Sequence, residues 1–408
     1  MKNYVIVGGG VASVACIEGI RQFDKTGKIY LVSGENKPTY CRPLISYYLQ
    51  GFTDFEKMKY RPDEFYADNN VELVFGKAES VDKKKKMVKV GERFITFDRL
   101  CIATGSSPFV PPFSGLETVD KKFSFMTEDD ALAIDKAIDE NSRVLIIGAG
   151  LIGLKCAEGL VGKVAHITVS DLAPRVLSSI LDDECAAYMQ RVLEEQGVSF
   201  LLGDSVSVFD KNTATFNSGK KVDFDLLILA VGVRANISLV KDAGGETNRG
   251  IIVNDKMQTS ITDIYAAGDC AEGFDNSINA NRVLAILPSA YAQGFTAGVN
   301  MADGDLPLKD EFPLNAIGFF GLHALTAGAY TGEMYQEKSE NGIKRLCFDG
   351  DRLVGFILIG EIQGAGIYTS LIKNKTVLTE KNKELLKKSP TLAIFDAETR
   401  AKKLGGVV

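Results

Sequence analysis

The sequence predicts an α/β protein with two Rossmann-like dinucleotide-binding domains and a smaller α+β domain near the C-terminus. Two glycine turns carry this prediction, because each follows a short apolar strand and opens a helix: GGGVAS at 8–13 and GAGLIG at 148–153. A third observation is that RLCIATG at 99–105 and DLLILAVG at 225–232 mirror each other. These paired strand–glycine segments indicate where the chain enters and leaves an inserted domain.

The first glycine turn follows a strand at residues 4–7. Gly8 makes the tight turn, Gly10 lets the backbone approach phosphates closely, and a helix begins at Val11. Ser13 stands where a third small residue lets the helix pack on the strand. Because a helix N-terminus presents free N–H groups and a positive dipole end, this unit is suited to bind a pyrophosphate.

The segment after this unit carries an acid and an arginine. A strand at 28–32 leads to Glu35, at about the spacing where an acid binds an adenosine ribose. Residues 36–51 then form a proline-containing loop with a short helix expected at 45–49. Arg42 in this loop can reach a phosphate or a ring carbonyl, although a plain surface arginine explains it equally well.

Short strands fill the region up to the first crossing. Residues 71–98 alternate as strands, and the four lysines at 83–86 are expected at a solvated hairpin tip. A buried strand at 100–103 then ends in Thr104 and Gly105, a turn that can approach a cofactor.

The second glycine unit is complete. A strand at 144–147 precedes the turn, a helix is expected from 154 to about 160, and the next strand, 166–170, ends at Asp171. Two such units in one chain, each followed by its acid, predict two bound dinucleotides.

After the inserted domain the chain returns with a strand at 264–267 that ends in Gly268 and Asp269, whose carboxylate can accept hydrogen bonds from a polyol. Residues 287–303 are expected to form a helix with Pro288 in its first turn, and its N-terminus is suited to face a ring oxygen.

The C-terminal part differs in character. Residues 310–378 alternate like antiparallel strands, with a turn at 349–351 and a helix through 367–373. The remaining tail, 379–408, is rich in lysine and amphipathic, so we expect it to be helical.

Composition excludes several classes of function. A net charge of −6 and a pI near 5.3 argue against nucleic acid as a partner, and no apolar run reaches the ~18 residues of a membrane span. Because the first residues are the first strand, no signal peptide is expected. Seven cysteines without a C-x-x-C suit a reducing cytoplasm and indicate no zinc or iron–sulfur site. The two histidines, His166 and His323, have no paired acid or nucleophile nearby in sequence, which favours structural roles.

Together these motifs resemble the flavoproteins of the pyridine nucleotide–disulfide oxidoreductase superfamily. The nearest branch looks like NADH:rubredoxin reductases, the flavin domain of NADH-dependent nitrite reductases and oxygenase-type ferredoxin reductases. The resemblance covers residues 2 to about 378 and rests on GGGVAS, GENKPTYCRPLIS, FDRLCIATG, GAGLIG, DLAPRVL and DIYAAGDCAE.

The resemblance implies a discontinuous FAD-binding domain at 1–110 and 237–309, an NAD-binding domain at 111–236 and an interface domain at 310–378, which in the family usually mediates dimerisation. The tail at 379–408 is not covered. The positions that match FAD-binding residues are Gly8, Gly10, Val11, Ser13, Glu35, Arg42, Pro43, Ala78, Ala103, Thr104, Gly105, Gly268, Asp269 and Pro288. Those that match NAD-binding residues are Gly148, Gly150, Ile152, Gly153, Asp171 and Gly232.

The resemblance also implies an activity: hydride passes from NADH to FAD, and electrons continue to a rubredoxin- or ferredoxin-like protein. A second hypothesis is an electron-transfer subunit of a larger enzyme whose other subunits hold iron–sulfur or other metal centres, which the uncovered tail favours. A third is an NADH oxidase or peroxidase using Cys41, but Cys41 precedes an Arg-Pro pair typical of the electron-transfer branch. The disulfide-reductase branch of the family needs a dithiol beside the flavin, and none is present.

Three further expectations concern individual side chains. Asp171 favours NADH over NADPH, because a carboxylate accepts from both ribose hydroxyls and repels a 2′-phosphate. Lysines at 83–86 and in the tail are candidates for docking an acidic partner. Where the family usually has a lysine near the flavin and a glutamate that pairs with it, this chain has Tyr47 and Lys155. Lys155 therefore either brings a cation toward the flavin or pairs with Glu158 on its own helix.

Overall fold

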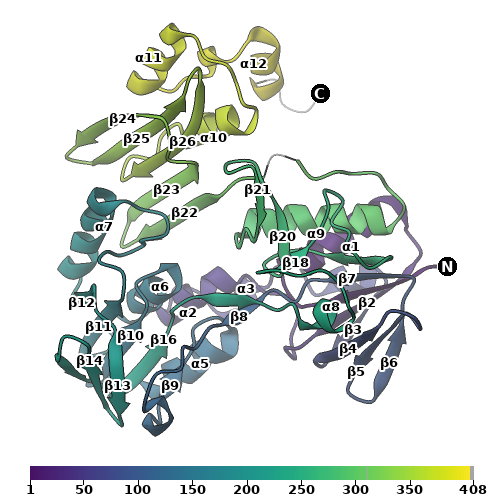
Figure 1. Ribbon diagram of the computed structural model, residues 1–408, viewed down its shortest axis with the longest axis horizontal. Coiled ribbons are helices and arrows are strands. Elements are labelled where there is room, and N and C mark those ends of the chain that lie inside the picture. Colours follow the sequence, from purple (N-terminus) through teal and green to yellow (C-terminus); the bar gives the residue numbers. More distant parts are fainter. Residues whose placement is uncertain (310, 405–408) are drawn as a thin grey trace. The chain divides into compact units, whose positions relative to one another are not determined.

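The computed structural model describes residues 1–309 and 311–404, and the chain divides into two compact units (Figure 1). The first comprises Met1–Phe274 and Asn281–Lys309; the second comprises Asp275–Ala280 and the described residues from 311 onward. None of the described helices has the length and apolar character needed to cross a membrane.

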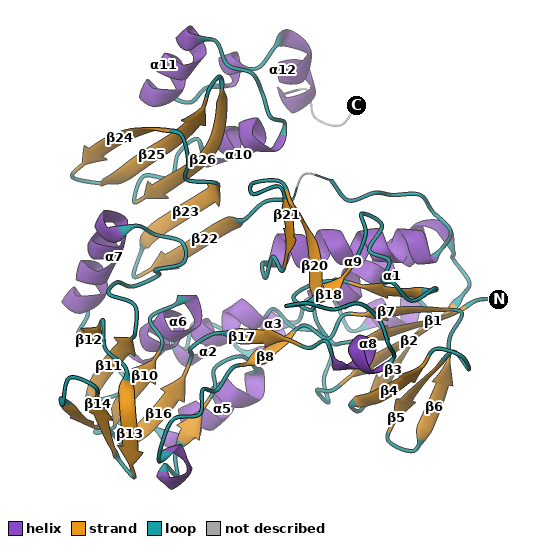
Figure 2. Cartoon of the chain, in the orientation of Figure 1, coloured by secondary structure: helices purple, strands orange, loops and turns teal. Residues whose placement is uncertain are grey.

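The first parallel sheet of unit 1 has five strands in the order β19-β7-β1-β2-β3 (Figure 2). Every neighbouring pair runs parallel, with Val5 between Tyr30 and Leu100 at the centre. The strands are β1 (Asn3–Val7), β2 (Lys28–Ser33), β3 (Val71–Phe75), β7 (Arg99–Ile102) and β19 (Ile264–Ala266). The four strand residues Tyr4 to Val7 are at most 4% exposed, as expected for a parallel strand covered on both faces.

Helices α1 (Val11–Phe23) and α9 (Leu287–Met301) pack against each other in unit 1 (Figure 1). Glycines on α9 allow very close backbone approach. A Cβ at Gly294 would lie 2.1 Å from the carbonyl oxygen of Ala12, and one at Gly298 would lie 2.1 Å from that of Cys16. The predicted helix at 287–303 is therefore confirmed, ending two residues earlier, and it fixes the position of the first glycine turn.

The second parallel sheet has the order β12-β11-β10-β16-β9, again with parallel neighbours throughout. Helix α6 starts at residue 151 rather than the expected 154, because the turn glycine at position 150 already caps it. The elements are β9 (Lys122–Phe123), β10 (Arg143–Ile147), β11 (His166–Asp171), β12 (Val198–Leu202), β16 (Leu226–Leu229), α5 (Glu128–Ala137), α6 (Leu151–Leu160) and α7 (Asp183–Glu195).

Small antiparallel sheets and short helices complete unit 1. The residues directly after the two mirrored segments pair with each other as β8 (Ser106–Pro108) and β17 (Val233–Ala235). The mirrored segments themselves contribute β7 and β16, which belong to different parallel sheets. The lysines at 83–86 lie between β4 and β5, as predicted for a hairpin tip. The other strands are β4 (Ala78–Asp82), β5 (Met87–Val90), β6 (Arg93–Thr96), β13 (Val206–Asp210), β14 (Thr213–Phe216), β15 (Lys221–Asp223), β18 (Ile251–Ile252), β20 (Ala271–Asp275) and β21 (Ala280–Arg282). The short helices are η1 (Arg42–Leu44), α2 (Ile45–Leu49), α3 (Phe55–Met58), α4 (Glu64–Asp68), η2 (Leu116–Thr118) and α8 (Ser238–Asp242).

Unit 2 contains a five-stranded antiparallel sheet in the order β22-β23-β26-β25-β24. The predicted turn at 349–351 joins β25 to β26. The strands are β22 (Leu314–Phe319), β23 (Leu322–Gly328), β24 (Glu333–Ser339), β25 (Gly342–Asp349) and β26 (Arg352–Ile359), and the helices are α10 (Ala365–Lys373), α11 (Glu380–Lys388), η3 (Leu392–Ile394) and α12 (Ala397–Leu404).

The segment after residue 378 forms helices, as predicted, but it also contributes to the core of unit 2. Leu386 of α11 is fully buried, and Ile394 and Phe395 are about 5% exposed, in the same hydrophobic cluster as Phe356 and Tyr368. The boundary expected between an interface domain and a tail therefore falls inside one packed unit. Unit 1 contains both parallel sheets. Its division into an FAD-binding domain and an NAD-binding domain stays a prediction.

Candidate cofactor-binding sites

The first glycine turn has the geometry of a cradle for a ligand. Gly8 has φ +134°, and a Cβ there would lie 1.9 Å from the carbonyl oxygen of Ala103, so a side chain is excluded. Ser13 donates from its hydroxyl to the Gly8 carbonyl at 2.6 Å, which ties the helix to the turn. By contrast, a Cβ at Gly10 would meet no described atom within 4 Å. The space in front of the turn is therefore open to an approaching ligand.

The N-terminus of α1 supplies donors to that space. Gly10 is its N-cap, and no side chain makes a capping hydrogen bond there. The first N–H groups of a helix lack partners inside the helix, so an anion is favoured at this end. Val11, the first helical residue, is 7% exposed. Open space and free donors together fit the pyrophosphate of a dinucleotide.

Glu35 and Arg42, predicted as separate FAD contacts, form an ion pair with each other. Tyr40 links them, since its hydroxyl donates to Glu35 Oε2 at 2.7 Å and accepts from Arg42 Nη1 at 3.3 Å. The backbone N–H of Glu128 also donates to Tyr40 Oη, at 2.9 Å. Both Glu35 oxygens accept hydrogen bonds here, and each retains lone-pair capacity for a ribose hydroxyl.

The turn after β7 brings further predicted residues together. Asn236 clamps this turn: its side-chain amide donates to the Thr104 carbonyl at 2.9 Å, and its backbone N–H donates to the Gly105 carbonyl at 2.9 Å. The Thr104 hydroxyl donates back to the Asn236 carbonyl at 2.8 Å. Gly105 has φ +63°, which favours glycine. The clamp holds the first crossing rigidly at the carboxyl end of the sheet.

Asp269 lies at the same edge. Ser106 Oγ donates to its Oδ2 at 3.2 Å. Burial raises the pKa of Asp269, while the Ser106 hydroxyl and the positive charge of Arg42 act against that rise. Arg42 is thus close enough to act electrostatically on Asp269. A half-buried carboxyl at this edge is suited to hydrogen-bond the hydroxyls of a polyol chain.

Gly268 and α9 complete this region. Gly268 has φ +78°, and its N–H donates to Oε1 of the fully buried Gln293 at 2.9 Å. Pro288 lies exposed in the first turn of α9, and no side chain caps that helix. Pro43 is exposed and lies within η1, the turn before α2. Ala78 is half-buried at the start of β4, and none of the described hydrogen bonds connects it to the other predicted residues.

The second glycine turn repeats the construction of the first. Gly148 has φ +117°, and a Cβ there would lie 2.2 Å from the Ala230 carbonyl oxygen. A Cβ at Gly153 would lie 2.0 Å from the Gly148 carbonyl oxygen, while one at Gly150 would meet no described atom within 4 Å. Gly150 caps α6 without a side-chain bond. In both turns the first glycine, Gly8 or Gly148, is crowded by a backbone carbonyl oxygen, whereas Gly10 or Gly150 faces open space.

Asp171 is fixed by this second turn. Its two carboxylate oxygens accept from the backbone N–H groups of Ala149, at 2.7 Å, and Ala173, at 2.8 Å. The nearby cation Arg175 pairs instead with Asp183 at 2.8 Å. Gly232 has φ +116° with open space around it, and Ile152 lies in the first turn of α6. The acid is therefore held at the turn, where a ribose would be recognised.

Lys155 pairs with Glu158 on its own helix, which was one of the two sequence hypotheses, and it also lies over the ring of Tyr47. Its ammonium lies 2.5 Å from Glu158 Oε2 and 5.2 Å from the centre of the Tyr47 ring. The Glu158 side chain is only 7% exposed, whereas that of Lys155 is 21% exposed. Helix α2, which carries Tyr47, packs on α6, because Gly159 leaves room for Leu49. The lysine thus links α2 to α6, the helix that follows the second glycine turn.

The cysteines form no disulfide. All seven are among the described residues, and all are free thiols. Six are buried, and Cys41 is half-buried. Burial raises the pKa of the Cys41 thiol, with a hydrogen bond from the backbone of Leu44 acting in the opposite direction. A raised pKa disfavours the thiolate that redox chemistry requires.

Three residues of these sites were not expected from the sequence: Tyr40, Asn236 and Gln293. Asn236 lies just after the second crossing, so its position relative to the mirrored glycine segments was a usable signal. Tyr40 and Gln293 have no such local signal, because they act through hydrogen bonds to residues distant in the chain.

The comparison with known families agrees with this geometry. Residues 2–294 match the family model described as pyridine nucleotide-disulphide oxidoreductase. The chain belongs to this family. As a member, it is an FAD-dependent NAD(P)H oxidoreductase, and its cofactors are FAD and NAD(H).

Two curated relatives illustrate its neighbourhood. The NADH-dependent phenylglyoxylate dehydrogenase subunit epsilon of Aromatoleum evansii is 31% identical over 396 residues, covering 92% of this chain and 93% of that protein. The nitrite reductase [NAD(P)H] of Bacillus subtilis is 31% identical over 399 residues, covering 94% of this chain. The match spans only 48% of that longer reductase.

Solved structures support the fold. Putidaredoxin reductase in its covalent complex with putidaredoxin superposes with a TM-score of 0.87 at 23% identity, covering 100% of this chain and 99% of that one. NADH:rubredoxin oxidoreductase from Clostridium acetobutylicum gives a TM-score of 0.76 at 22% identity, covering 93% and 97%. The doubly wound α/β architecture predicted from the glycine turns is therefore confirmed.

Proposed function

We propose that this oxidoreductase uses NADH to deliver electrons to a protein acceptor of the rubredoxin or ferredoxin type. When bound, FAD accepts a hydride from NADH and releases electrons to the acceptor. The supporting observation is the pair of open glycine turns, Gly8–Gly10 and Gly148–Gly150, in a chain whose cysteines are all free thiols. Two dinucleotides and no dithiol suit electron transfer from flavin to another protein.

The protein's own contribution is to bind and orient. In this proposal the first turn and the N-terminus of α1 hold the FAD pyrophosphate, Glu35 the ribose and Asp269 the ribityl chain. Arg42 and Pro43 line the flavin, and Tyr47 and Lys155 approach it from α2 and α6. The second turn and Asp171 hold NADH. No acid or base among the side chains is required, which suits a chain with two histidines.

We further propose a preference for NADH over NADPH. The Asp171 carboxylate is held at the second turn by two backbone N–H groups and would repel a 2′-phosphate. Arg175, the cation nearest in sequence, is engaged with Asp183. Steady-state kcat/KM for the two nucleotides with a dye acceptor tests this, and a ratio in favour of NADPH contradicts it.

The acceptor is tested with purified protein loaded with FAD. Reduction of rubredoxin, of a [2Fe–2S] ferredoxin and of dioxygen by NADH would be compared under the same conditions. The proposal requires that at least one of the two proteins be reduced much faster than dioxygen. Equal or faster reduction of dioxygen would favour the oxidase alternative, which the raised pKa of Cys41 already disfavours.

A second candidate is an electron-transfer subunit of a larger cytoplasmic complex. Its support is the near full-length similarity to a protein described as a dehydrogenase subunit, 93% of which is covered. Affinity purification from the native host decides between the two: co-purification in fixed ratio with metal-containing subunits favours the complex. Purification of a lone chain, or of a homodimer formed through the C-terminal unit, favours the independent enzyme.

A further inference from the structure

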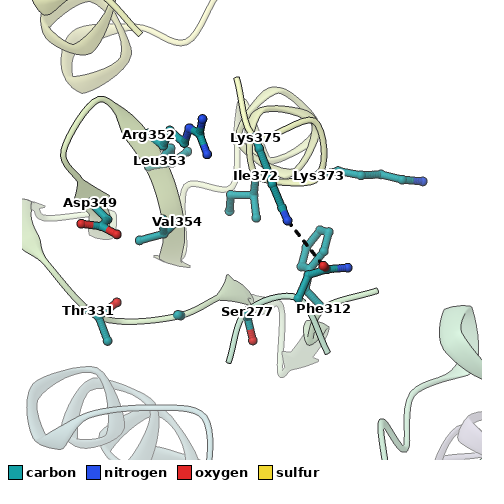
Figure 3. A pocket seen from close by; sticks show the side chains of 12 residues that line it. Ser277, Phe312, Thr331, Asp349, Arg352, Leu353, Val354, Ile372, Lys373 and Lys375 are labelled. Atoms are coloured by element: carbon teal, nitrogen blue, oxygen red, sulfur yellow. Dashed lines mark hydrogen bonds between the residues drawn. The ribbon is translucent and has the colours of Figure 1, made fainter. Parts of the chain in front are cut away.

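Unit 2 contains a cavity that none of the cofactor contacts uses. Its volume is about 280 Å³, and it lies between the segment at 276–277, the start of β26 and the C-terminal end of α10 (Figure 3). Every lining residue belongs to unit 2. The volume is at the lower end of the range for small-molecule sites, so it suits a small ligand.

The charged groups around the cavity are unequal in sign. Arg352, Lys373 and Lys375 line it, against the single carboxylate of Asp349. Among the described residues, no carboxylate lies within 4.0 Å of the ammonium of Lys373 or Lys375, and Arg352 reaches only Asp351, at 3.9 Å. In Figure 3 Lys375 extends across the cavity, whereas Lys373 extends away from the other side chains. The excess of unpaired cations favours an anion.

Lys375 occupies a backbone position that glycine usually fills. It follows α10 with φ +47° and completes a Schellman motif, in which its N–H donates to the Ile372 carbonyl and that of Thr376 to the Leu371 carbonyl, both at 3.1 Å. A residue with a Cβ is strained in this conformation. The Lys375 ammonium lies at the cavity and donates a long hydrogen bond, 3.4 Å, to Asn276 Oδ1.

The remaining wall is largely apolar. Phe312 and Ile372 line one side, and Leu353 and Val354 of β26 line another (Figure 3). The hydroxyls of Ser277 and Thr331 add neutral hydrogen-bonding groups. An inorganic anion would leave the apolar surface unused, whereas an organic anion would cover it.

We propose that this cavity binds a small organic carboxylate with an apolar body. The Lys375 ammonium and the Arg352 guanidinium receive the carboxylate, because both are donors that match it and neither is neutralised at close range. The apolar part packs on Phe312 and Ile372. The site is independent of the FAD and NADH contacts, so its occupancy is measured as binding and not as turnover.

Benzoate is a suitable probe, and ligand-observed NMR and calorimetry on the full FAD-loaded protein measure its binding. Lys375→Gly removes the ammonium and relieves the backbone strain, so this variant should remain folded. We expect benzoate to bind the native protein with one-to-one stoichiometry and at least about tenfold more weakly in Lys375→Gly. Arg352→Gln should weaken binding similarly, whereas Lys381→Gln, an exposed lysine of α11, should not.

Benzyl alcohol and inorganic phosphate separate the two parts of the proposal. The neutral alcohol should bind far more weakly than benzoate, because it lacks the charge, and phosphate should also bind more weakly, because it lacks the apolar body. Benzoate binding that is absent, or equal in native protein and Lys375→Gly, overturns the site. Phosphate binding as tight as that of benzoate overturns the ligand class.

Discussion

Removing the cation of Lys155 is predicted to destabilise the second glycine-turn region. In Lys155→Met the alkyl stem is kept, but the Glu158 carboxylate, 7% exposed, loses an ammonium 2.5 Å away. Breaking a fully buried ion pair costs ~3–5 kcal/mol, and the 21% exposure of Lys155 reduces this. Loss of the cation–π contact with Tyr47 adds ~0.5–1 kcal/mol. We therefore expect a net loss of about 2–3 kcal/mol.

Thermal unfolding followed by circular dichroism measures this loss. A destabilisation of about 2 kcal/mol should lower Tm by roughly 3 °C for a unit of the size of Met1–Phe274 with Asn281–Lys309. The matched control is Lys163→Met, which breaks the pair with Asp135, whose partners are 35% and 37% exposed. That exposed pair should contribute less than ~1 kcal/mol. Equal Tm shifts in the two variants would refute the reasoning that burial makes the Lys155 pair important.

Redox titration of the same variants tests the proposed position of Lys155 beside the flavin. A cation there stabilises the negative charge that develops on flavin reduction. We expect the flavin midpoint potential to fall in Lys155→Met and reduction by NADH to slow in stopped-flow experiments. The Glu158→Gln variant should shift the potential the opposite way, because it removes the negative charge beside the cation. An unchanged midpoint in both variants would leave Lys155 with a structural role only.

Four further predictions concern other sites. Asp171→Ser should narrow the preference for NADH, measured as the ratio of kcat/KM values, and an unchanged ratio would remove Asp171 from nucleotide selection. Cys41→Ser should retain most NADH-dependent dye reduction; lost turnover with FAD still bound would favour the oxidase alternative. Reduction of an acidic protein acceptor should slow with rising salt and in Lys83→Gln, and a rate independent of salt would count against steering by lysines. Leu386→Ala should destabilise unit 2 by about 2–5 kcal/mol, measured by thermal unfolding or limited proteolysis, because that side chain is fully buried. A neutral result there would show that α11 contributes little to the core.

The glycine turns were predictable because their chemistry is local. A strand, a glycine that needs φ > 0 and a following helix are all encoded within about ten residues. Gly8 and Gly148 indeed have φ +134° and +117°, with carbonyl oxygens where a Cβ would lie. Local spacing also indicated that the acid after the next strand lies at the turn. The Asp171 carboxylate accepts a hydrogen bond from the backbone N–H of Ala149 in that turn.

Side chains that act between distant segments were not predictable in the same way. The sequence suggested that Glu35 and Arg42 contact different parts of FAD, yet they pair, with Tyr40 bridging them to residue 128. The Lys155 alternatives also depended on packing, because only the approach of α2 to α6 places Tyr47 within reach of the ammonium. Spacing predicted the Lys155–Glu158 pair, because both residues lie on one helix, but it carries no information about contacts between side chains on separate elements.

Contacts with distant segments also decide which lysines of the tail at 379–408 stay available to a partner. A lysine-rich amphipathic segment predicts a solvated helix, and α11 is such a helix. However, Lys387 pairs with Glu384 at 2.8 Å and lies over the rings of Tyr335 and Phe348, and Lys383 pairs with Glu380 at 2.7 Å. These stems cover the core of unit 2 while their charges are neutralised. The capacity to steer an acidic partner therefore falls to the exposed lysines of the tail, Lys381 and Lys388, and to those at 83–85.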